Sequence, residues 1–406
     1  MKRRVMTFAA MSVAAVLALG IGASPAAQAQ TFTVLHNFNG DSDGAYPVGQ
    51  PVVDSNGNIF GTTQQEGLFS DGTAWELTSD GTFIVLHSFD YSKDGAQVLA
   101  GVKLDGKGNM FGTTDEGPSG YYGSVFEITS DGTFSTLYKF GSQKNDPGGI
   151  YGGITLDTSG DLYGMSEYGG SSGNCAVGCG TVWKLSSSGS ETVLHSFDGS
   201  DGEYPYGGNL KLDARGNIYG VASWGGTGYA GTLFETTSGG AFRVLHNFNW
   251  RDNDCIPSGS LREYKGNLYG TSQGYADGYG CRRDGAVWQY NIRSKKFKVL
   301  HSFSGTDGYW PIGGVGCQEG KKTVCAGNIF GTTFLGGTNG YGTVWEIDAK
   351  GKFSTVYNFT GTEGETPTDR PFVDQKGNLF GTTVNGGLYG NGTLWEITAA
   401  KKTQRR

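Results

Sequence analysis

The sequence repeats one phrase seven times, and this repetition restricts the possible folds more than any other feature. The phrase reads GNIFGTT at residues 57–63 and returns, with small changes, at 108–114, 160–166, 216–222, 266–272, 327–333 and 377–383. A second phrase, TVLHSF or a close variant, recurs with intervals of 51 to 57 residues. Repeats of this length predict one array of similar units rather than two or three unrelated domains.

Each unit contains the signals for four short strands. In the first complete unit these are residues 51–54, 58–63, 73–78 and 83–89. The first turn reads Asp-x-x-Gly-Asn, in which Asp bonds the following backbone and Gly supplies a positive φ. The chain has 72 glycines, 13% aromatic residues and only 17% charged residues, which is typical of a turn-rich all-β protein and not of a disordered one.

The third strand of every unit carries a large aromatic residue at one position. These residues are Trp75, Phe126, Trp183, Phe234, Trp288, Trp345 and Trp395. A single four-stranded sheet cannot bury both of its faces, but neighbouring sheets can share a core. We therefore expect these rings to fill the wedges between adjacent sheets.

The two ends of the repeat array are complementary. Residues 31–38 form a lone fourth strand, whereas residues 371–374, 378–383 and 393–398 supply only the first three strands of the last unit. The N-terminal strand would complete that sheet and remove the exposed edges of an open array. This predicts an all-β fold, a seven-bladed β-propeller over residues 30–398 with four-stranded blades and a velcro closure. An open β-solenoid is the alternative, although solenoid repeats usually run about 20–29 residues.

The first 29 residues have the pattern of a secretory signal peptide. Three basic residues at 2–4 precede an apolar run at 6–21, and Ala-Gln-Ala at 27–29 resembles a cleavage site. An uncleaved anchor is the alternative. Cleavage near Ala29 would change the formal charge from −7 to −10, which disfavours nucleic acid and anionic membranes as partners. We expect a secreted, extracellular or periplasmic monomer with no membrane span in the mature chain and a polar tail at 399–406.

Six cysteines in an exported chain favour disulfide bonds. All six lie in the three longest intervals of the repeat. The predicted pairs, each of which would staple an insertion, are Cys175–Cys179, Cys255–Cys281 and Cys317–Cys325. A metal site is the alternative, but no CxxC motif occurs.

The phrases GNLYGTT, GTVWEI and TVLHSF, the last followed by Asp-Gly, occur across residues 31–398. On these residues the chain resembles exported bacterial proteins with the tandem repeat called GloVer. The resemblance implies a secreted or surface-anchored propeller, often with a C-terminal sorting segment. The ending KKTQRR at 401–406 departs from such a segment. The resemblance implies no catalytic residues, and none are transferred.

Residue types that often take part in catalysis, His and Glu, occupy repeated positions here and are expected to be structural. The five histidines lie at one repeat position, where Tyr138 and Tyr357 stand in the other two units. Glutamates recur in the third strands in the same way. No HExxH motif occurs, and no glycine-rich phosphate loop follows a strand and opens a helix. Acidic loops such as DSDG at 41–44 make calcium a possible ligand, but their acidic ligand set is incomplete; no other cofactor or metal is expected.

The loops that follow the second and fourth strands leave from one face of each unit, which we call the loop face. Its residues differ most between repeats, so we expect a site there. The candidates for acid–base catalysis are Glu66, Glu116 and Glu167. The candidates for ligand binding are Asp115, Tyr168, Trp224 and Trp310. Aromatic faces beside carboxylates suit sugars, although solvated loop residues would have the same pattern.

The fifth unit departs most from the repeat. Trp250, Arg282 and Arg283 lie in its loops near Cys255 and Cys281, together with further Arg and Asp residues. Such a cation cluster could hold the carboxylate of a uronic acid; Arg–Asp pairs that order a long loop are the alternative. The sequence thus favours an extracellular binding module for a glycan or an extracellular protein. The alternative is a secreted polysaccharide lyase or glycoside hydrolase.

Overall fold

The fold is described from a computed structural model. It describes residues 30–117, 122–250, 255–274, 284–318 and 327–399. Residues 31–399 form one compact unit. The predicted signal peptide and the tail beyond residue 399 lie outside the described residues, so the description below concerns the unit Thr31–Ala399.

This unit is an all-β ring of seven antiparallel sheets, the blades, and its described residues contain no helix. Blade 1 contains β2 (Ala45–Val53), β3 (Ile59–Gln65), β4 (Thr73–Leu77) and β5 (Phe83–Ser88). Blade 2 contains β6 (Lys103–Leu104), β7 (Met110–Thr114), β8 (Ser124–Ile128) and β9 (Phe134–Lys139). Blade 3 contains β10 (Thr155–Leu156), β11 (Leu162–Ser166), β12 (Thr181–Leu185) and β13 (Glu191–Ser196). Blades 4 and 5 are built from β14 (Lys211–Leu212), β15 (Ile218–Ala222), β16 (Thr232–Thr236), β17 (Phe242–Asn247); and β18 (Pro257–Tyr264), β19 (Asn267–Ser272), β20 (Ala286–Asn291), β21 (Lys296–Ser302).

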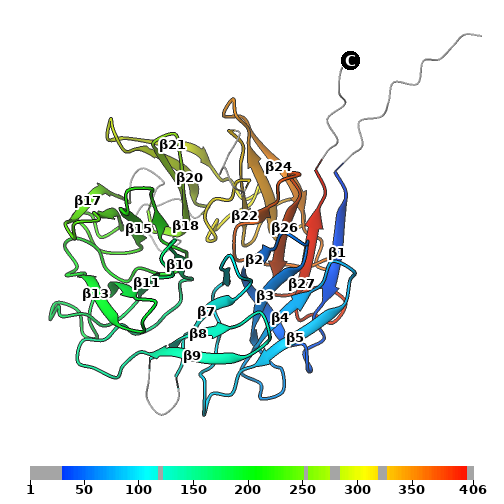
Figure 1. Cartoon of the computed structure of the whole chain (residues 1–406). Coiled ribbons are helices and arrows are strands. Elements are labelled where there is room, and N and C mark those ends of the chain that lie inside the picture. Colours follow the sequence, from blue (N-terminus) through cyan, green and yellow to red (C-terminus); the bar gives the residue numbers. More distant parts are fainter. Residues whose placement is uncertain (1–29, 118–121, 251–254, 275–283, 319–326, 400–406) are drawn as a thin grey trace, which may run out of the picture. The chain divides into compact units, whose positions relative to one another are not determined.

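Blade 6 contains β22 (Ile329–Thr333), β23 (Thr343–Ile347) and β24 (Phe353–Asn358), and a bridge between Gly316 and Phe330 marks the place of its inner strand. Blade 7 contains β25 (Phe372–Val373), β26 (Leu379–Thr383), β27 (Thr393–Ile397) and, as its outer strand, β1 (Phe32–Asn37). In Figure 1 the blue β1 lies beside the red β27. The register pairs Phe32 with Ile397, which confirms the predicted velcro closure.

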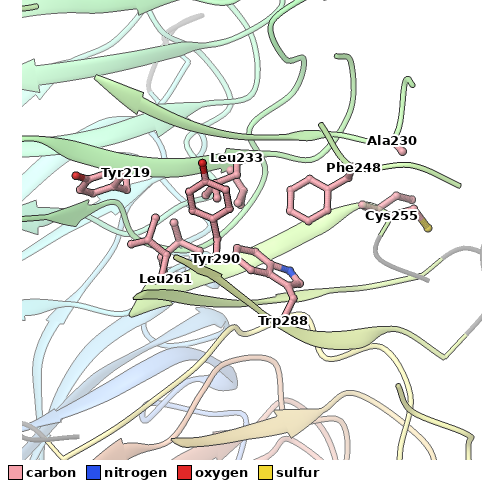
Figure 2. Close-up of a cluster of buried hydrophobic side chains, with 11 residues drawn as sticks. Tyr219, Ala230, Leu233, Phe248, Cys255, Leu261, Trp288 and Tyr290 are labelled. Carbon is pink, nitrogen blue, oxygen red and sulfur yellow. The ribbon is translucent and has the colours of Figure 1, made fainter. Parts of the chain in front are cut away.

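Hydrophobic clusters join each blade to the next. Seven such clusters occur among the described residues, one at each seam of the ring. Figure 2 shows the cluster between blades 4 and 5, where Leu233 and Phe248 from blade 4 meet Leu261 and Trp288 from blade 5. The ring of Phe248 lies 5.4 Å from that of Trp288. The third-strand aromatics therefore fill the wedges between sheets, as the repeat predicts.

The glycine of the repeated GTT phrase makes this packing possible. It pairs in register with the third-strand aromatic, as Gly331 does with Trp345. A Cβ at Gly331 would overlap the indole ring of Trp345, and the same holds for each equivalent glycine and its Trp or Phe partner. The ring thus lies flat on the backbone of the neighbouring strand, and only glycine leaves room for it.

The repeated histidines form clamps between blades. His36 Nε2 lies 2.9 Å from Asp43 Oδ2 in the following loop, and its ring stacks on Phe83 of blade 1 at 3.9 Å. His195 and His301 make the same pair of contacts. Asp43 also accepts from the backbone N–H of Asn39. The structure therefore gives this repeat position a structural role.

The cysteines are disulfide-bonded where the structure describes them. Cys175 and Cys179 form one bond, with Cα atoms 5.2 Å apart, which confirms that predicted pair. Cys255 and Cys317 are also disulfide-bonded. Their predicted partners, Cys281 and Cys325, lie outside the described residues.

Candidate functional site

Glycine-rich segments at the inner ends of the blades pack closely around the axis of the ring. A Cβ at Gly49 would overlap the backbone of Gly101, and one at Gly208 would overlap Gly259. Inner segments of neighbouring blades thus touch backbone to backbone. Two cavities lie on the two sides of these segments. One opens among the loop-face segments, and the other opens among the turns between first and second strands, on what we call the turn face.

An inner residue with a left-handed backbone helps to shape the loop face in every blade. The residues at this position are Tyr46, Gln97, Gly149, Tyr204, Ile256, Trp310 and Thr366, and the six that are not glycine have φ between 49° and 58°. The N–H of Tyr204 donates to the carbonyl of Cys179 in the preceding blade at 3.0 Å. Non-glycine residues in this conformation are strained and cluster at functional sites. Their side chains also differ from blade to blade.

The loop-face cavity has a volume of about 370 Å³ and is lined by residues from all seven blades. Its larger polar side chains are Gln64, Gln97, Gln273, Tyr151 and Tyr206. The rings of Tyr151 and Tyr206 lie 5.3 Å apart at an angle of 39°. Tyr206 is 48% exposed, so this pair offers an aromatic surface at the mouth of the cavity.

Two carboxylates lie beside these tyrosines. Burial, followed by repulsion from Glu116 and Glu167, raises the pKa of Asp115 to about 6. Burial also raises the pKa of Glu167, which accepts a hydrogen bond from the Tyr168 hydroxyl. The backbone N–H of Ile150 donates to Asp115, but its Oδ1 is buried with no hydrogen-bond partner in the part of the chain that the structure describes. A buried acceptor in that state favours an external donor.

The charges reach the tyrosines of the cavity. Burial and then the negative charges of Asp115 and Glu167 raise the pKa of Tyr151. Burial, followed by the charges of Glu167 and Asp115, also raises the pKa of Tyr206. Because these groups influence one another, the structure brings Asp115, Glu167, Tyr151 and Tyr206 into one electrostatic environment at the boundary of blades 2, 3 and 4.

The other predicted site residues make contacts of their own. Glu116 is exposed and accepts from Gln97 Nε2 at 2.8 Å. Glu66 forms a parallel bridge with Asp71 in the loop after β3. The predicted aromatics form pairs, with Tyr168 5.9 Å from Tyr204, Trp224 5.9 Å from Trp250, and Trp310 6.2 Å from Phe334.

None of the eight described candidates of the loop face is among the residues that line the 370 Å³ cavity. Arg282 and Arg283 lie outside the described residues. Three of the residues that do line the cavity, Gln97, Tyr151 and Tyr206, come from the segments between the fourth and first strands. An alignment of those segments by repeat would have found them, because Tyr151 and Tyr206 share one repeat position, where blade 2 has Leu99 and blade 6 has Ile312.

The acidic loops that suggested calcium have other roles in the structure. Asp43, Asp201 and Asp307 accept hydrogen bonds in the histidine clamps. Among the residues that the structure describes, no group of three or more His, Cys, Asp or Glu side chains is placed to hold a metal ion. Nor does that part of the chain contain a helix long and apolar enough to span a membrane.

A ring of seven antiparallel sheets, six of four strands and one of three strands with an added bridge, closed by its own N-terminal strand, is a seven-bladed β-propeller. The sequence matches the model of the Gloeobacter/Verrucomicrobia repeat over residues 23–179 and 148–324, and the chain belongs to this family. This confirms the resemblance seen in the repeated phrases. No curated protein matches the sequence.

Solved structures of similar fold include two lyases and an extracellular domain. The streptogramin B lyase structure has a TM-score of 0.59 and 15% identity, over 92% of this chain and 100% of that one. An oligogalacturonate lyase from Vibrio parahaemolyticus has a TM-score of 0.56 and 9% identity, over 91% and 97%. The extracellular domain of a putative hybrid two component system from B. thetaiotaomicron has 0.56 and 11%, over 93% of this chain and 40% of that one. At these identities the likeness shows the fold alone.

Proposed function

We propose that the protein is an extracellular binding module whose loop-face cavity takes a neutral glycan. The observation that carries this proposal is the Tyr151–Tyr206 pair beside Asp115, whose buried Oδ1 has no protein partner among the described residues. A sugar ring stacks its C–H face on an aromatic side chain and donates hydroxyl hydrogens to carboxylates. The tyrosine pair lines the cavity, and Asp115, although outside the lining, lies within electrostatic reach of the pair, so an aromatic face and a carboxylate acceptor lie close together.

The charge of the cavity selects among glycans. Its described lining contains no Lys or Arg, whereas Asp369 lines it and Asp115 and Glu167 act on its tyrosines. Uronic acids would meet like charge there, so a neutral sugar fits better. The extracellular setting rests on the predicted signal peptide.

Titration of the purified protein with neutral and acidic oligosaccharides tests the proposal. Neutral glucan, galactan or mannan oligomers should bind saturably, and Tyr206→Ala and Tyr151→Ala should weaken binding at least about tenfold. Tyr389→Ala is the matched control, because Tyr389 is 56% exposed in a blade 7 loop and does not line the cavity. Equal affinity in all three variants, or no binding to any neutral glycan, would overturn the proposal.

One observation favours a second candidate, a glycan-cleaving enzyme. A carboxyl with a pKa near 6, such as that of Asp115, beside a second carboxylate, Glu167, is the pair that acid–base cleavage of a glycosidic bond requires. In that case the bound oligosaccharide should be cleaved, and Asp115→Asn should abolish product while binding persists. Binding with no product over long incubation would exclude the enzyme and support the binding module.

A further inference from the structure

The cavity on the turn face differs from the loop-face cavity in both size and charge. It has a volume of about 780 Å³ and is lined by the inner strands and turns of blades 2, 3, 4, 5 and 7. This size is typical of a site for a small molecule. Its lining contains four basic side chains, Lys103, Lys211, Arg262 and Arg370, which we call the basic cluster.

The basic cluster departs from the repeat. Lys103, Lys211 and Arg262 occupy one repeat position on the first strands of blades 2, 4 and 5, where blade 1 has Val52 and blade 7 has Phe372. Arg370 comes from a different position, two residues before Phe372. Because the repeat marks the scaffold, four basic residues converging on one cavity from four blades are not a by-product of repetition.

Arg370 is the most buried member of the cluster, with 3% of its surface exposed. Its Nη2 donates to Gln50 Oε1 at 2.9 Å, which joins blades 7 and 1 at the ring axis. Its Nε and Nη1 are buried and have no hydrogen-bond partner in the described part of the chain. Guanidinium donors in this state favour a bound oxyanion, which accepts their hydrogen bonds and supplies the missing charge.

The carboxylates near the basic cluster accept hydrogen bonds from backbone N–H groups. Asp369 accepts from the backbone N–H groups of Gln50 and Arg370, at 2.8 and 2.7 Å. Asp105, Asp157 and Asp213, which line the cavity, accept from backbone N–H groups of their own turns. Glu263 accepts from the N–H of Gly266 at 2.8 Å. These hydrogen bonds fix the carboxylates in their turns, from which Asp369 acts on Lys103 and Arg370, and Glu263 and Asp213 act on Lys211, by charge attraction.

The cations also repel one another. Burial lowers the pKa of Lys103 to about 7, and repulsion from Arg370 and Arg262 adds to the effect. Burial and then repulsion from Arg262 lower the pKa of Lys211. These interactions show that members of the cluster from blades 2, 4, 5 and 7 lie within electrostatic reach of one another. Four basic side chains gathered at one cavity, beside three aspartates of its lining, are a local feature that the formal charge of −7 conceals.

We propose that the turn-face cavity is a binding site for a small polyvalent oxyanion, a polycarboxylate or phosphate, held by Arg370, Lys103, Lys211 and Arg262. The oxyanion would accept hydrogen bonds from Nε and Nη1 of Arg370, and the positive charges of the two lysines would attract it. The site lies on the face opposite the proposed glycan site and does not depend on it.

Calorimetric titration of the purified protein with citrate and with inorganic phosphate, at constant ionic strength, tests this site. Acetate and chloride serve as monovalent comparisons. We expect saturable binding of citrate or phosphate at about one per chain, and the stronger of the two identifies the chemistry. Lys103→Met and Lys211→Met should each weaken it about tenfold or more. Lys107→Met, at an exposed turn residue, should leave it unchanged.

The variants remain informative if one of them is unstable. Both Met substitutions remove a charge that burial disfavours, so they should unfold at the same or higher temperature than the parent, which a thermal melt without ligand checks. Binding that is equal in the parent, Lys103→Met and Lys211→Met would overturn the proposal. So would the same weak response to acetate and chloride as to citrate and phosphate, because that result shows ionic screening only.

Discussion

The backbone of Gly61 lies against the indole of Trp75, so closely that a Cβ at Gly61 would overlap Cζ2 of the ring. The two residues are register partners on β3 and β4, and Trp75 is fully buried. Gly61 has no left-handed φ, so its identity is set by the ring above it and not by the backbone.

Gly61→Ala should therefore destabilise the protein through overpacking, by about 1–3 kcal/mol. The matched control is Gly106→Ala, because Gly106 also lacks a left-handed φ and has open space where its Cβ would lie. Urea unfolding of the two variants gives the comparison. A Gly61→Ala variant as stable as Gly106→Ala would show that the strand can move away from the indole at little cost.

Two substitutions at Trp345 separate the contribution of its ring to stability from that of its N–H. The indole Nε1 of Trp345 is buried with no hydrogen-bond partner among the described residues, and blades 2 and 4 use Phe126 and Phe234 at the same position. Trp345→Phe should thus change stability by less than about 1.5 kcal/mol, whereas Trp345→Ala should cost about 3–5 kcal/mol. Denaturant unfolding measures both. A large loss in Trp345→Phe would reveal a partner for the N–H.

Asp115 gives the stability a defined pH dependence. Its raised pKa, about 6 in the folded protein, means that the folded state holds this proton more tightly than the unfolded chain, so the associated stability is present below pH 3.8 and is lost as the pH rises through 6. Asp115→Asn should then stabilise the protein at pH 8 by on the order of 1–2 kcal/mol and have little effect at pH 4.

Asp131 serves as a control of opposite sign. Hydrogen bonds from Thr129 and then Thr133 lower its pKa, so the stability it contributes is present above pH 3.8 and is lost as the pH falls further. Asp131→Asn should therefore lower stability at pH 8, where Asp115→Asn raises it. Urea unfolding at pH 4 and pH 8 measures both variants, and a gain from Asp115→Asn that is equal at the two values would contradict the assignment.

Lys103 should destabilise the empty protein. Its pKa is lowered to about 7 by burial, Arg370 and Arg262, with Asp369 acting in the opposite direction. The cost of the charge is fully present below pH 7 and fades as the pH rises toward the ordinary lysine value of 10.5. In anion-free buffer, Lys103→Met should thus gain on the order of 1 kcal/mol at pH 6 and less at pH 9. Thermal melts at the two pH values, with Lys107→Met as the reference, measure this; a loss of stability at pH 6 would contradict it.

The repeat predicts the blades because the same residues solve the same packing problem seven times. The aromatic at Trp75 and the turn at Asp54 are local features, and pattern alone places them on strands and turns. The closing pair β1 and β27 is also readable, because the first and last units are incomplete in complementary ways. The role of the GTT glycine is not readable in this way, since it depends on a ring in the next strand.

The sites are harder to predict because they are built from residues that break the repeat. Tyr151 and Tyr206 lie 55 positions apart and meet only because blades 3 and 4 are neighbours at the axis. Lys103, Arg262 and Arg370 come from blades that are not consecutive. Sequence reasoning favoured Glu66 and Glu116 because loops on one face were treated as equivalent, whereas distance from the axis decides which side chains reach the cavity.

The pairing of β1 with β27 also makes folding depend on the length of the chain. Among the described strands β1 is the first in the chain and its sheet partner, β27, is the last, so blade 7 cannot be completed until the chain extends to Ile397. Blades 1 to 5 each consist of consecutive strands and can assemble locally. A chain that stops early would leave β1 without a sheet and would remove packing from Trp75, since Phe372, Phe380 and Leu394 share its cluster. Completion of synthesis, rather than any single blade, is therefore the step that commits this protein to its native state.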